Sequence, residues 1–234
     1  MFIANNISKQ INNKIILDNI SLELKKGEIT ILFGSSGCGK TSLCRSLALL
    51  DYPDSGNINI DNKQYMFPSN QKNLHLPDKV NMVFQQLFLW PHLTNEENIK
   101  LALNKFSSHK KKLFTHLIKL LSIENILTQY PNESSVGQKQ RIAIARVLIL
   151  EPKFIFLDEI TSALDIVQIN NITKLLIQLK KENIGMLLIT HDLHFIEQVA
   201  DRILFMNNGK IVESGGKELL INPKTKLLKD FLYL

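Results

Sequence analysis

The sequence predicts an α/β fold built around a parallel sheet, and two observations carry this prediction. Short apolar runs alternate with helical patterns through the second half of the chain, the order expected of strand–helix–strand units. Near the N-terminus, the apolar run 29–33 leads into a glycine-rich stretch and then a helical pattern. Crossovers of this kind are right-handed and join parallel strands, so we expect a parallel sheet.

The composition favours one globular domain over residues 1–234. Hydrophobic residues make up 44% of the chain, enough for a sizeable core. The net charge is +6, but the basic residues are spread out and the longest basic run is 110–112. This pattern is typical of a solvated helix face, so we expect no nucleic-acid partner. No run of about 18 apolar residues and no secretory signal pattern is present in the sequence, which favours a cytoplasmic protein.

The N-terminal third is expected to form an antiparallel β lobe. Residues 1–6 and 14–25 alternate apolar and polar positions on either side of a turn at Asn12 and Asn13. Ile58 and Ile60 predict a further strand that ends at the turn 61–62, and residues 64–78 have an irregular pattern. The apolar run 80–84 predicts a short strand that ends at Gln85.

The glycine-rich stretch has the spacing of a P-loop, which binds phosphate when a strand enters it and a helix leaves it. Its backbone N–H groups and the helix N-terminus would hold the phosphates. Lys40 would reach the β and γ phosphates, and the Thr41 hydroxyl would bind Mg²⁺. The alternative is an ordinary turn between strand and helix. The residues expected to bind nucleotide here are Gly34, Ser35, Ser36, Gly37, Cys38, Gly39, Lys40, Thr41 and Ser42.

Residues 86–140 are expected to form an inserted helical subdomain. Thr94 and Glu97 have the spacing of a capping box, and apolar residues continue at helical spacing to Leu103 and again from Leu113. Pro131 ends this pattern, and a polar loop then opens a helix that Pro152 closes.

The remaining chain alternates strands and helices. Residues 154–157 and 185–190 are buried-strand runs, residues 166–181 and 193–200 are helical, and a hairpin turn is expected at 207–209. The tail from residue 216 is expected to be helical and polar.

Two carboxylates follow the strand 154–157, at the sheet edge where α/β proteins bind ligands. Asp158 would hold Mg²⁺ and Glu159 would polarise an attacking water, as phosphoryl transfer needs both a phosphate cradle and a metal-holding carboxylate. The alternative is a pair of helix-capping residues.

The further motifs resemble those of an ATP-binding-cassette ATPase, the P-loop NTPase subunit that powers a membrane transporter. Gln85 matches the glutamine loop, residues 130–138 resemble the signature loop, and His191 matches the switch histidine. The loop after Glu159 also matches, through Ser162, Ala163, Leu164 and Asp165.

The resemblance implies a site shared by two copies packed head to tail around ATP and Mg²⁺. Ser135, Gly137 and Gln138 of one copy would bind the γ-phosphate that the second copy holds, and Asp165 would also belong to the nucleotide site. Glu159, His191 and Gln85 would be catalytic, and the metal residues would be Thr41, Gln85 and Asp158.

Three residues depart from the family pattern. Ser134 stands where Leu is usual, and Val136 stands where Gly is usual. A β-branched residue is unfavourable at positive φ, so either hydrolysis is slower or the loop tolerates the change. Ile11 stands where an aromatic residue usually stacks on adenine, which predicts weaker contact with the base.

The segment 84–94, with Glu97, Asn98 and the 222–224 tail motif, resembles the importers of polar amino acids. This implies transmembrane permease partners, an indirect solute-binding protein, and a place on the cytoplasmic face of the inner or plasma membrane. Two alternatives stay open: the ATPase of an exporter or lipoprotein-release system, and a nucleotide-gated regulatory protein with weak hydrolysis.

Overall fold

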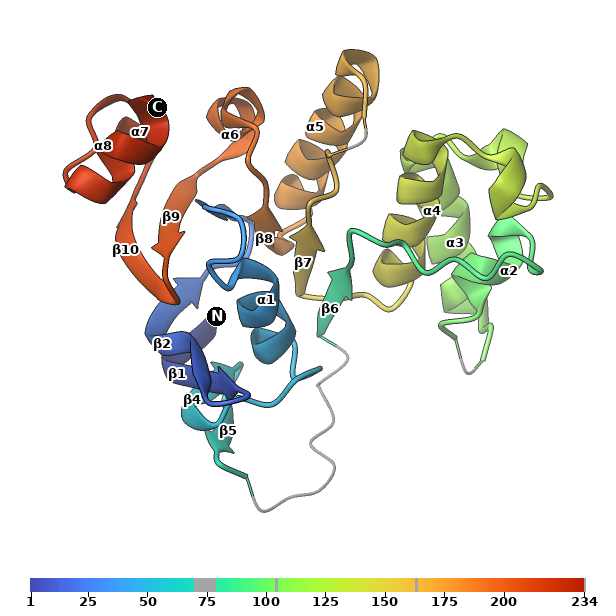
Figure 1. The fold of residues 1–234 in the computed structure, drawn as a ribbon. Coiled ribbons are helices and arrows are strands. Elements are labelled where there is room, and N and C mark those ends of the chain that lie inside the picture. The colour runs from blue at the N-terminus through green and yellow to red at the C-terminus, as the bar shows by residue number, and fades with distance from the viewer. Residues whose placement is uncertain (70–78, 104, 163, 234) are drawn as a thin grey trace.

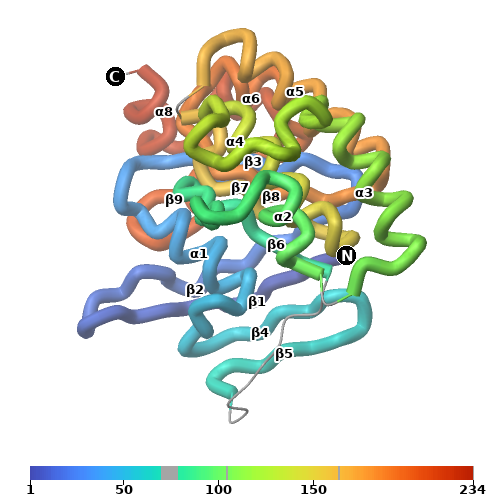
Figure 2. Tube along the Cα trace, turned by 90° about the vertical axis from the view of Figure 1, so that its right-hand side faces the viewer, coloured from blue at the N-terminus to red at the C-terminus, as the bar shows by residue number. Residues whose placement is uncertain are grey.

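The computed structural model of the chain describes residues 1–69, 79–103, 105–162 and 164–233. These residues form two sheets with helices around them (Figure 1). Figure 2 shows the layers: α4, α5 and α6 lie on one side of the central strands, and α1 and the smaller sheet lie on the other.

The larger sheet has six strands, of which five are parallel and β10 is antiparallel to β9. The parallel sheet predicted from the sequence is therefore confirmed. Every residue of β3, β7 and β8 is buried, as expected for strands covered on both faces. In spatial order the strands are β10 (Lys210–Gly215), β9 (Arg202–Asn207), β3 (Ile29–Gly34), β8 (Gly185–Ile189), β7 (Phe154–Asp158) and β6 (Val80–Val83).

The smaller sheet is antiparallel, as predicted for the N-terminal lobe. Asn12 and Asn13 have φ of 51° and 62°, which makes the tight hairpin turn expected at that point. Its order is β2 (Lys14–Leu24), β1 (Phe2–Ile11), β4 (Ser55–Ile60) and β5 (Lys63–Phe67).

Strand β5 corrects the prediction of an irregular segment over 64–78. Asp61 and Asn62 adopt φ of 46° and 70° and turn the chain back so that β5 pairs with β4. Most β5 side chains are exposed, so the strand lacks the apolar alternation that would reveal it in the sequence. Residues 70–78 of the same prediction lie outside the described residues.

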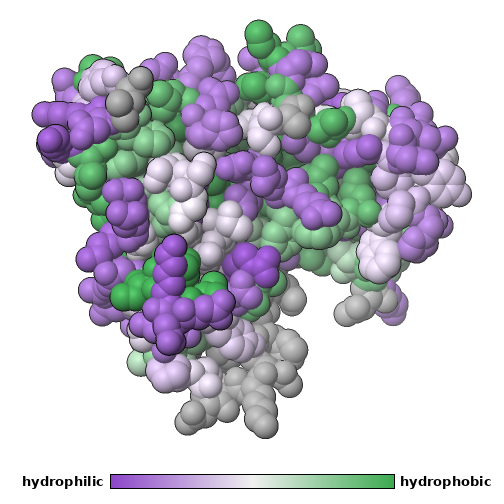
Figure 3. All heavy atoms as spheres, viewed as in Figure 1, coloured by the Kyte–Doolittle hydropathy of each residue, from purple (hydrophilic) through white to green (hydrophobic). Residues whose placement is uncertain are grey.

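Two hydrophobic cores hold these layers together. One lies between the two sheets and contains Leu43 and Leu47 of α1 together with Phe2 and Phe156. The other lies on the opposite face of the central sheet, where α4, α5 and α6 pack. On the face shown in Figure 3, hydrophilic and apolar residues are interspersed, as expected when most apolar side chains are inside.

Helices α2, α3 and α4 gather at one side of the molecule (Figure 1). Thr94 and Glu97 form the expected capping box at the start of α2, but this helix ends at Lys100 and Leu103 lies beyond it. Helix α4 continues through residue 140, where the helical subdomain was predicted to end. The helices are α1 (Lys40–Leu47), α2 (Asn95–Lys100), α3 (Ser108–Leu120), α4 (Val136–Leu148), α5 (Ile166–Lys181), α6 (Leu193–Val199), α7 (Glu218–Ile221) and α8 (Lys226–Tyr233).

The C-terminal tail is helical, as predicted, but it is not simply polar. Leu219 and Leu228 are fully buried, and the Phe231 ring lies 5.4 Å from that of Phe205 and 5.8 Å from that of Phe33. The tail therefore closes one end of the core. Within the described chain, every helix is too short or too polar to cross a membrane.

Candidate active site

The P-loop joins the central strand β3 to α1. Gly37 and Gly39 have φ of 75° and 106°, a backbone region open to glycine at low cost. Lys40 is the first residue of α1, and its ammonium group donates to the carbonyl oxygens of Gly34 at 2.9 Å and Ser35 at 2.8 Å. The ammonium group thus folds back over the loop, where it is positioned for an anionic ligand.

The β9–β10 hairpin, which is distant in sequence, contacts this loop and holds it in place. The N–H of Gly209 donates to the Cys38 carbonyl at 3.0 Å, and the Gly209 carbonyl accepts from the N–H of Asp18 at 2.9 Å. A Cβ at position 34 would lie 2.0 Å from the Met206 carbonyl oxygen. The P-loop is therefore fixed by backbone contacts to residues about 170 positions away.

A cleft of about 280 Å³ opens above the P-loop. A Cβ built on Gly37 would meet no described protein atom within 4 Å, so the loop offers open space at this point. This fits a phosphate group approached by backbone N–H groups. The cleft is lined by Ile16, Ser36, Gly37, Gly39, Lys40, Thr41, Ser42 and Glu159.

Three predicted catalytic residues come together at the carboxyl ends of neighbouring strands. Gln85 follows β6, Glu159 follows β7 and His191 follows β8. The Gln85 amide Nε2 donates to Glu159 Oε2 at 3.1 Å, and His191 Nδ1 lies 4.0 Å from Glu159 Oε1. Glu159 has φ of 47°, which is costly for a residue with a side chain and is held by a hydrogen bond from its N–H to the Ile189 carbonyl.

Asp158 is buried at the end of β7, beside this group. Burial raises the pKa of its carboxyl, as does the neighbouring charge of Glu159, against the opposing effects of a hydrogen bond from Thr41 and the charges of Lys40 and Arg45. A cation would relieve the cost of keeping this carboxylate charged. The hydroxyl of Thr41, the carboxylate of Asp158 and the amide oxygen of Gln85 are all oxygen donors, the ligand type that Mg²⁺ prefers, so these residues fit that ion.

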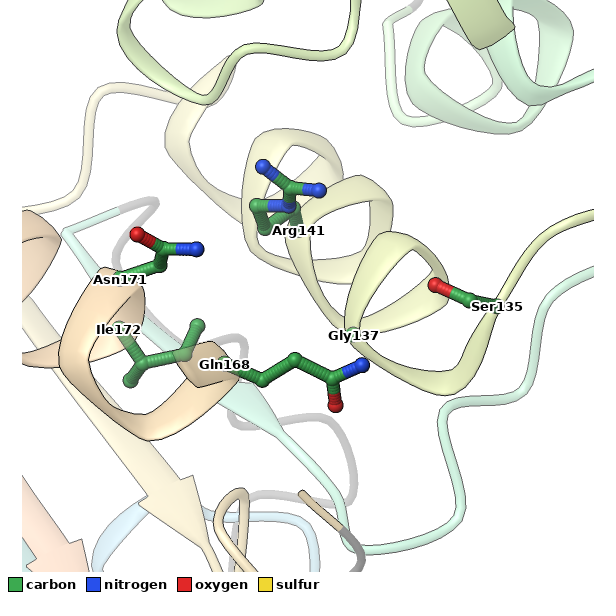
Figure 4. A pocket seen from close by; sticks show the side chains of 6 residues that line it. All are labelled: Ser135, Gly137, Arg141, Gln168, Asn171 and Ile172. Atoms are coloured by element: carbon green, nitrogen blue, oxygen red, sulfur yellow. The ribbon is translucent and has the colours of Figure 1, made fainter. Parts of the chain in front are cut away.

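Two of the predicted signature residues, Ser135 and Gly137, line a second pocket. Ser135 caps α4: its hydroxyl accepts from the N–H of Gln138 at 3.3 Å, while the Gln138 side chain accepts from the N–H of Ser135 at 2.7 Å. Gly137 lies against Gln168 of α5, since a Cβ there would be 3.0 Å from Gln168 Cδ. Figure 4 shows the six lining residues, which differ from those of the P-loop cleft: Ser135, Gly137, Arg141, Gln168, Asn171 and Ile172.

Asp165 caps α5 and precedes Gln168, which lines this pocket, by three residues. The Asp165 carboxylate accepts from the N–H of Gln168 at 2.8 Å, as an N-cap side chain does. Ala163 of the same loop lies outside the described residues.

A family model described as "ABC transporter" matches residues 17–162, which include the P-loop, Gln85, the signature loop and both carboxylates. The chain belongs to the ABC transporter family. Two relatives extend the likeness over nearly the whole chain. The glutamate transport ATP-binding protein GluA of Corynebacterium glutamicum is 40% identical and covers 92% of this chain and 91% of its own. The glutamine transport ATP-binding protein GlnQ of Escherichia coli is 36% identical and covers 97% and 96%.

Solved ABC cassettes have the same fold. The dimeric cassette MJ0796, in a post-hydrolysis state bound to ADP and Pi, superposes with a TM-score of 0.78 at 28% identity and covers 93% of this chain and 99% of its own. The expectation of an ABC-type ATPase fold is therefore confirmed, and that cassette is a dimer with bound nucleotide.

For two residues that depart from the ABC pattern, the structure can be compared with the effect expected from the sequence. Val136 is the first residue of α4 and has a helical backbone, so the strain expected from a β-branched residue at positive φ does not arise. Ile11 lies beside the Asn12–Asn13 turn and its side chain is 46% exposed. The apolar residue that lines the P-loop cleft is Ile16, which sequence reasoning missed because it reads as one more strand position.

Proposed function

We propose that this chain is the ATP-binding and ATP-hydrolysing subunit of an ABC transporter for polar amino acids. One observation supports hydrolysis above all: Glu159 borders the Lys40 cleft, its carboxylate accepts a hydrogen bond from the Gln85 amide, and His191 Nδ1 lies 4.0 Å from it. The glutamate and glutamine transport proteins among its relatives support the substrate class. An exporter of similar architecture is the alternative that the permease partner would distinguish.

Each group near the cleft has a proposed role. The ammonium of Lys40 and the N–H groups of the P-loop bind the phosphates, and the carboxylate of Glu159 orients a water molecule for attack on the γ-phosphorus. The Gln85 amide fixes the Glu159 carboxylate, and His191 approaches the same carboxylate from β8. Thr41, Asp158 and Gln85 would hold Mg²⁺, which neutralises phosphate charge when bound.

The site is proposed to be completed by a second copy of the chain. Ser135 and Gly137 line a pocket separate from the P-loop cleft, so one copy presents two incomplete halves. Head-to-tail packing would bring the signature loop of each copy to the ATP held by the other, with Gln138 and Asp165 nearby. Loss of the γ-phosphate would remove contacts across this interface and let the dimer open.

The proposed membrane partner is a pair of permease subunits. The segment after Gln85 exposes Phe88 and Trp90, which are suited to contact another protein. Through the permease, the chain would lie at the cytoplasmic face of the membrane and act indirectly with a solute-binding protein.

The experiment that tests hydrolysis compares the steady-state ATPase rate of the protein with that of Glu159→Gln. Loss of the carboxylate that orients water should lower kcat by about 100-fold or more, with ATP binding retained. The same variant should dimerise when ATP is added, and Lys40→Ala should abolish that dimerisation. Equal ATPase rates in the protein and in Glu159→Gln would favour a nucleotide-gated regulatory protein and contradict the proposed enzyme.

A further inference from the structure

We propose that Asn95 is a positioning residue for the signature loop and acts through the Ser134 hydroxyl. The proposal rests on the function inferred above, in which Ser135 and Gly137 serve the ATP of a second copy. Its basis is a buried polar contact between α2 and the residue that precedes the α4 cap.

Asn95 is fully buried at the start of α2. Its amide Nδ2 donates to the Ile126 carbonyl at 2.7 Å and to Ser134 Oγ at 2.9 Å, and its backbone N–H donates to the Gln129 carbonyl at 2.9 Å. Asn95 thus fixes three points along the chain that leads into the signature loop.

Ser134 transmits this contact to the site. It is also buried, and its N–H donates to the Pro131 carbonyl at 3.2 Å. The next residue, Ser135, is the cap of α4 and lines the signature pocket. Because the two are joined by one rigid peptide unit, a shift of Ser134 moves the Ser135 hydroxyl and the first N–H groups of α4.

Helix α2 also holds the segment that follows Gln85. Asn98, another fully buried residue of α2, accepts from the N–H of Trp90 at 2.7 Å and donates to the Trp90, Leu93 and Thr94 carbonyls. The two asparagines therefore make α2 a short rigid link between the segment after Gln85 and the signature loop.

Asn95 combines directional contacts with an unpaired polar atom. Its Oδ1 atom is buried and lacks a hydrogen-bond partner in the described chain, a cost that offsets part of the stabilisation from the two hydrogen bonds that Nδ2 donates. Contacts that add little net stability but fix one geometry are what a positioning residue provides. It also explains why Ser, rather than the usual Leu, is accommodated at position 134.

The test is a double-mutant cycle made in the Glu159→Gln background, where ATP drives dimerisation. Ser134→Ala removes the acceptor, Asn95→Val removes the amide, and the third variant combines both. Ser134→Ala should raise the ATP concentration at half-maximal dimerisation about threefold to tenfold, the range expected for one lost hydrogen bond. Asn95→Val should raise it at least as much, because this variant also loses the hydrogen bond to the Ile126 carbonyl. The combined variant should match Asn95→Val alone, because Ser134→Ala removes a contact that Asn95→Val has already lost. ATP affinity of the monomer should stay unchanged.

The controls separate positioning from folding. Asn59→Val removes a similar side-chain amide contact, to Asn57 in β4, and should leave dimerisation unchanged. Ser134→Thr keeps the hydroxyl and should restore dimerisation towards that of the parent. Additive effects of Ser134→Ala and Asn95→Val, or losses that follow only the melting temperature, would overturn the proposal. Failure of the Glu159→Gln parent itself to dimerise would instead contradict the proposed function.

Discussion

The P-loop and the signature loop are held in the fold by different kinds of contact. The P-loop is fixed mainly by its backbone: positive-φ glycines, a carbonyl contact to Gly209 and close packing of Gly34 against Met206. The signature loop is fixed mainly by side chains, through the Ser135–Gln138 capping box and the Asn95–Ser134 hydrogen bond.

This difference determines what each loop tolerates. The P-loop accepts few residue types, because a Cβ on Gly34 or Gly39 would meet a backbone oxygen and Gly37 has a positive φ that disfavours a side chain. A loop held by side chains can exchange one set of contacts for another. This accounts for an intact glycine pattern from Gly34 to Gly39 beside a signature loop that carries Ser134 and Val136.

The largest effect should come from Gly34→Ala. The new Cβ would lie 2.0 Å from the Met206 carbonyl oxygen, so β3 and β9 must separate. We expect the free energy of unfolding to fall by about 3 kcal/mol or more, as measured by urea denaturation. Gly37→Ala is the matched control: its Cβ meets open space, so only the left-handed backbone penalty of about 1 to 2 kcal/mol applies. Equal losses in the two variants would show that backbone packing does not fix this loop.

Gly137→Ala should have a smaller effect. The Cβ would lie 3.0 Å from the end of the flexible Gln168 side chain, which can move. Alanine also favours the helix by about 1 kcal/mol over glycine, so the free energy of unfolding should change by less than about 1 kcal/mol. Thermal unfolding of this variant, alone and with Gln168→Ala, checks it. A loss as large as that of Gly34→Ala would contradict the contrast between the loops.

The smallest effect concerns a side-chain contact in the P-loop region. Arg45 near the end of α1 pairs with Asp51 at 2.5 Å, and this hydrogen bond lowers the pKa of Asp51 against the opposing effect of burial. Both side chains are more than one-third exposed, so solvent screening limits the contribution of the pair to about 0.5 kcal/mol.

The difference in stability between Asp51→Asn and the parent should depend on pH. Because the pKa of Asp51 is lowered on folding, its stabilisation is present above the unfolded-state value of about 3.9 and is lost as the pH falls towards the folded-state pKa. The variant should be less stable than the parent at pH 7, and the difference should shrink as the pH falls below about 3.9, as measured by urea denaturation. A difference that does not shrink would point to packing instead. The exposed Asp230→Asn is the control.

Much of the fold follows from periodicity. Helix α5 has the predicted bounds of 166–181, because a helix with one buried face shows its period. Strands β3, β7 and β8 coincide with apolar runs to within one or two residues, because strands buried on both faces are apolar throughout. The exposed strand β5 and the buried face of the tail, at Leu228 and Phe231, were missed. Strand β5 has mostly exposed side chains and so lacks an apolar pattern, whereas the burial of the tail depends on Phe33 and Phe205, which lie far away in the sequence.

Some residues of the candidate site could also be predicted from the sequence, and others could not. The P-loop and the carboxylates at 158–159 can be found from local motifs, and the structure places Gln85 and His191 beside Glu159. The place of Ile16 in the cleft and the burial of Asn95 could not be predicted. Ile16 looks like any strand residue, and an asparagine in a helical pattern reads as solvent-facing unless the residues that bury it are known.

The brace between Gly209 and the P-loop also orders events during synthesis. Met206 and Gly209 emerge from the ribosome some 170 residues after the glycine-rich stretch. Until then the loop lacks the strand and carbonyl contacts that shape it. We expect the loop to adopt its phosphate-binding conformation only after the β9–β10 hairpin has been made and has folded against it.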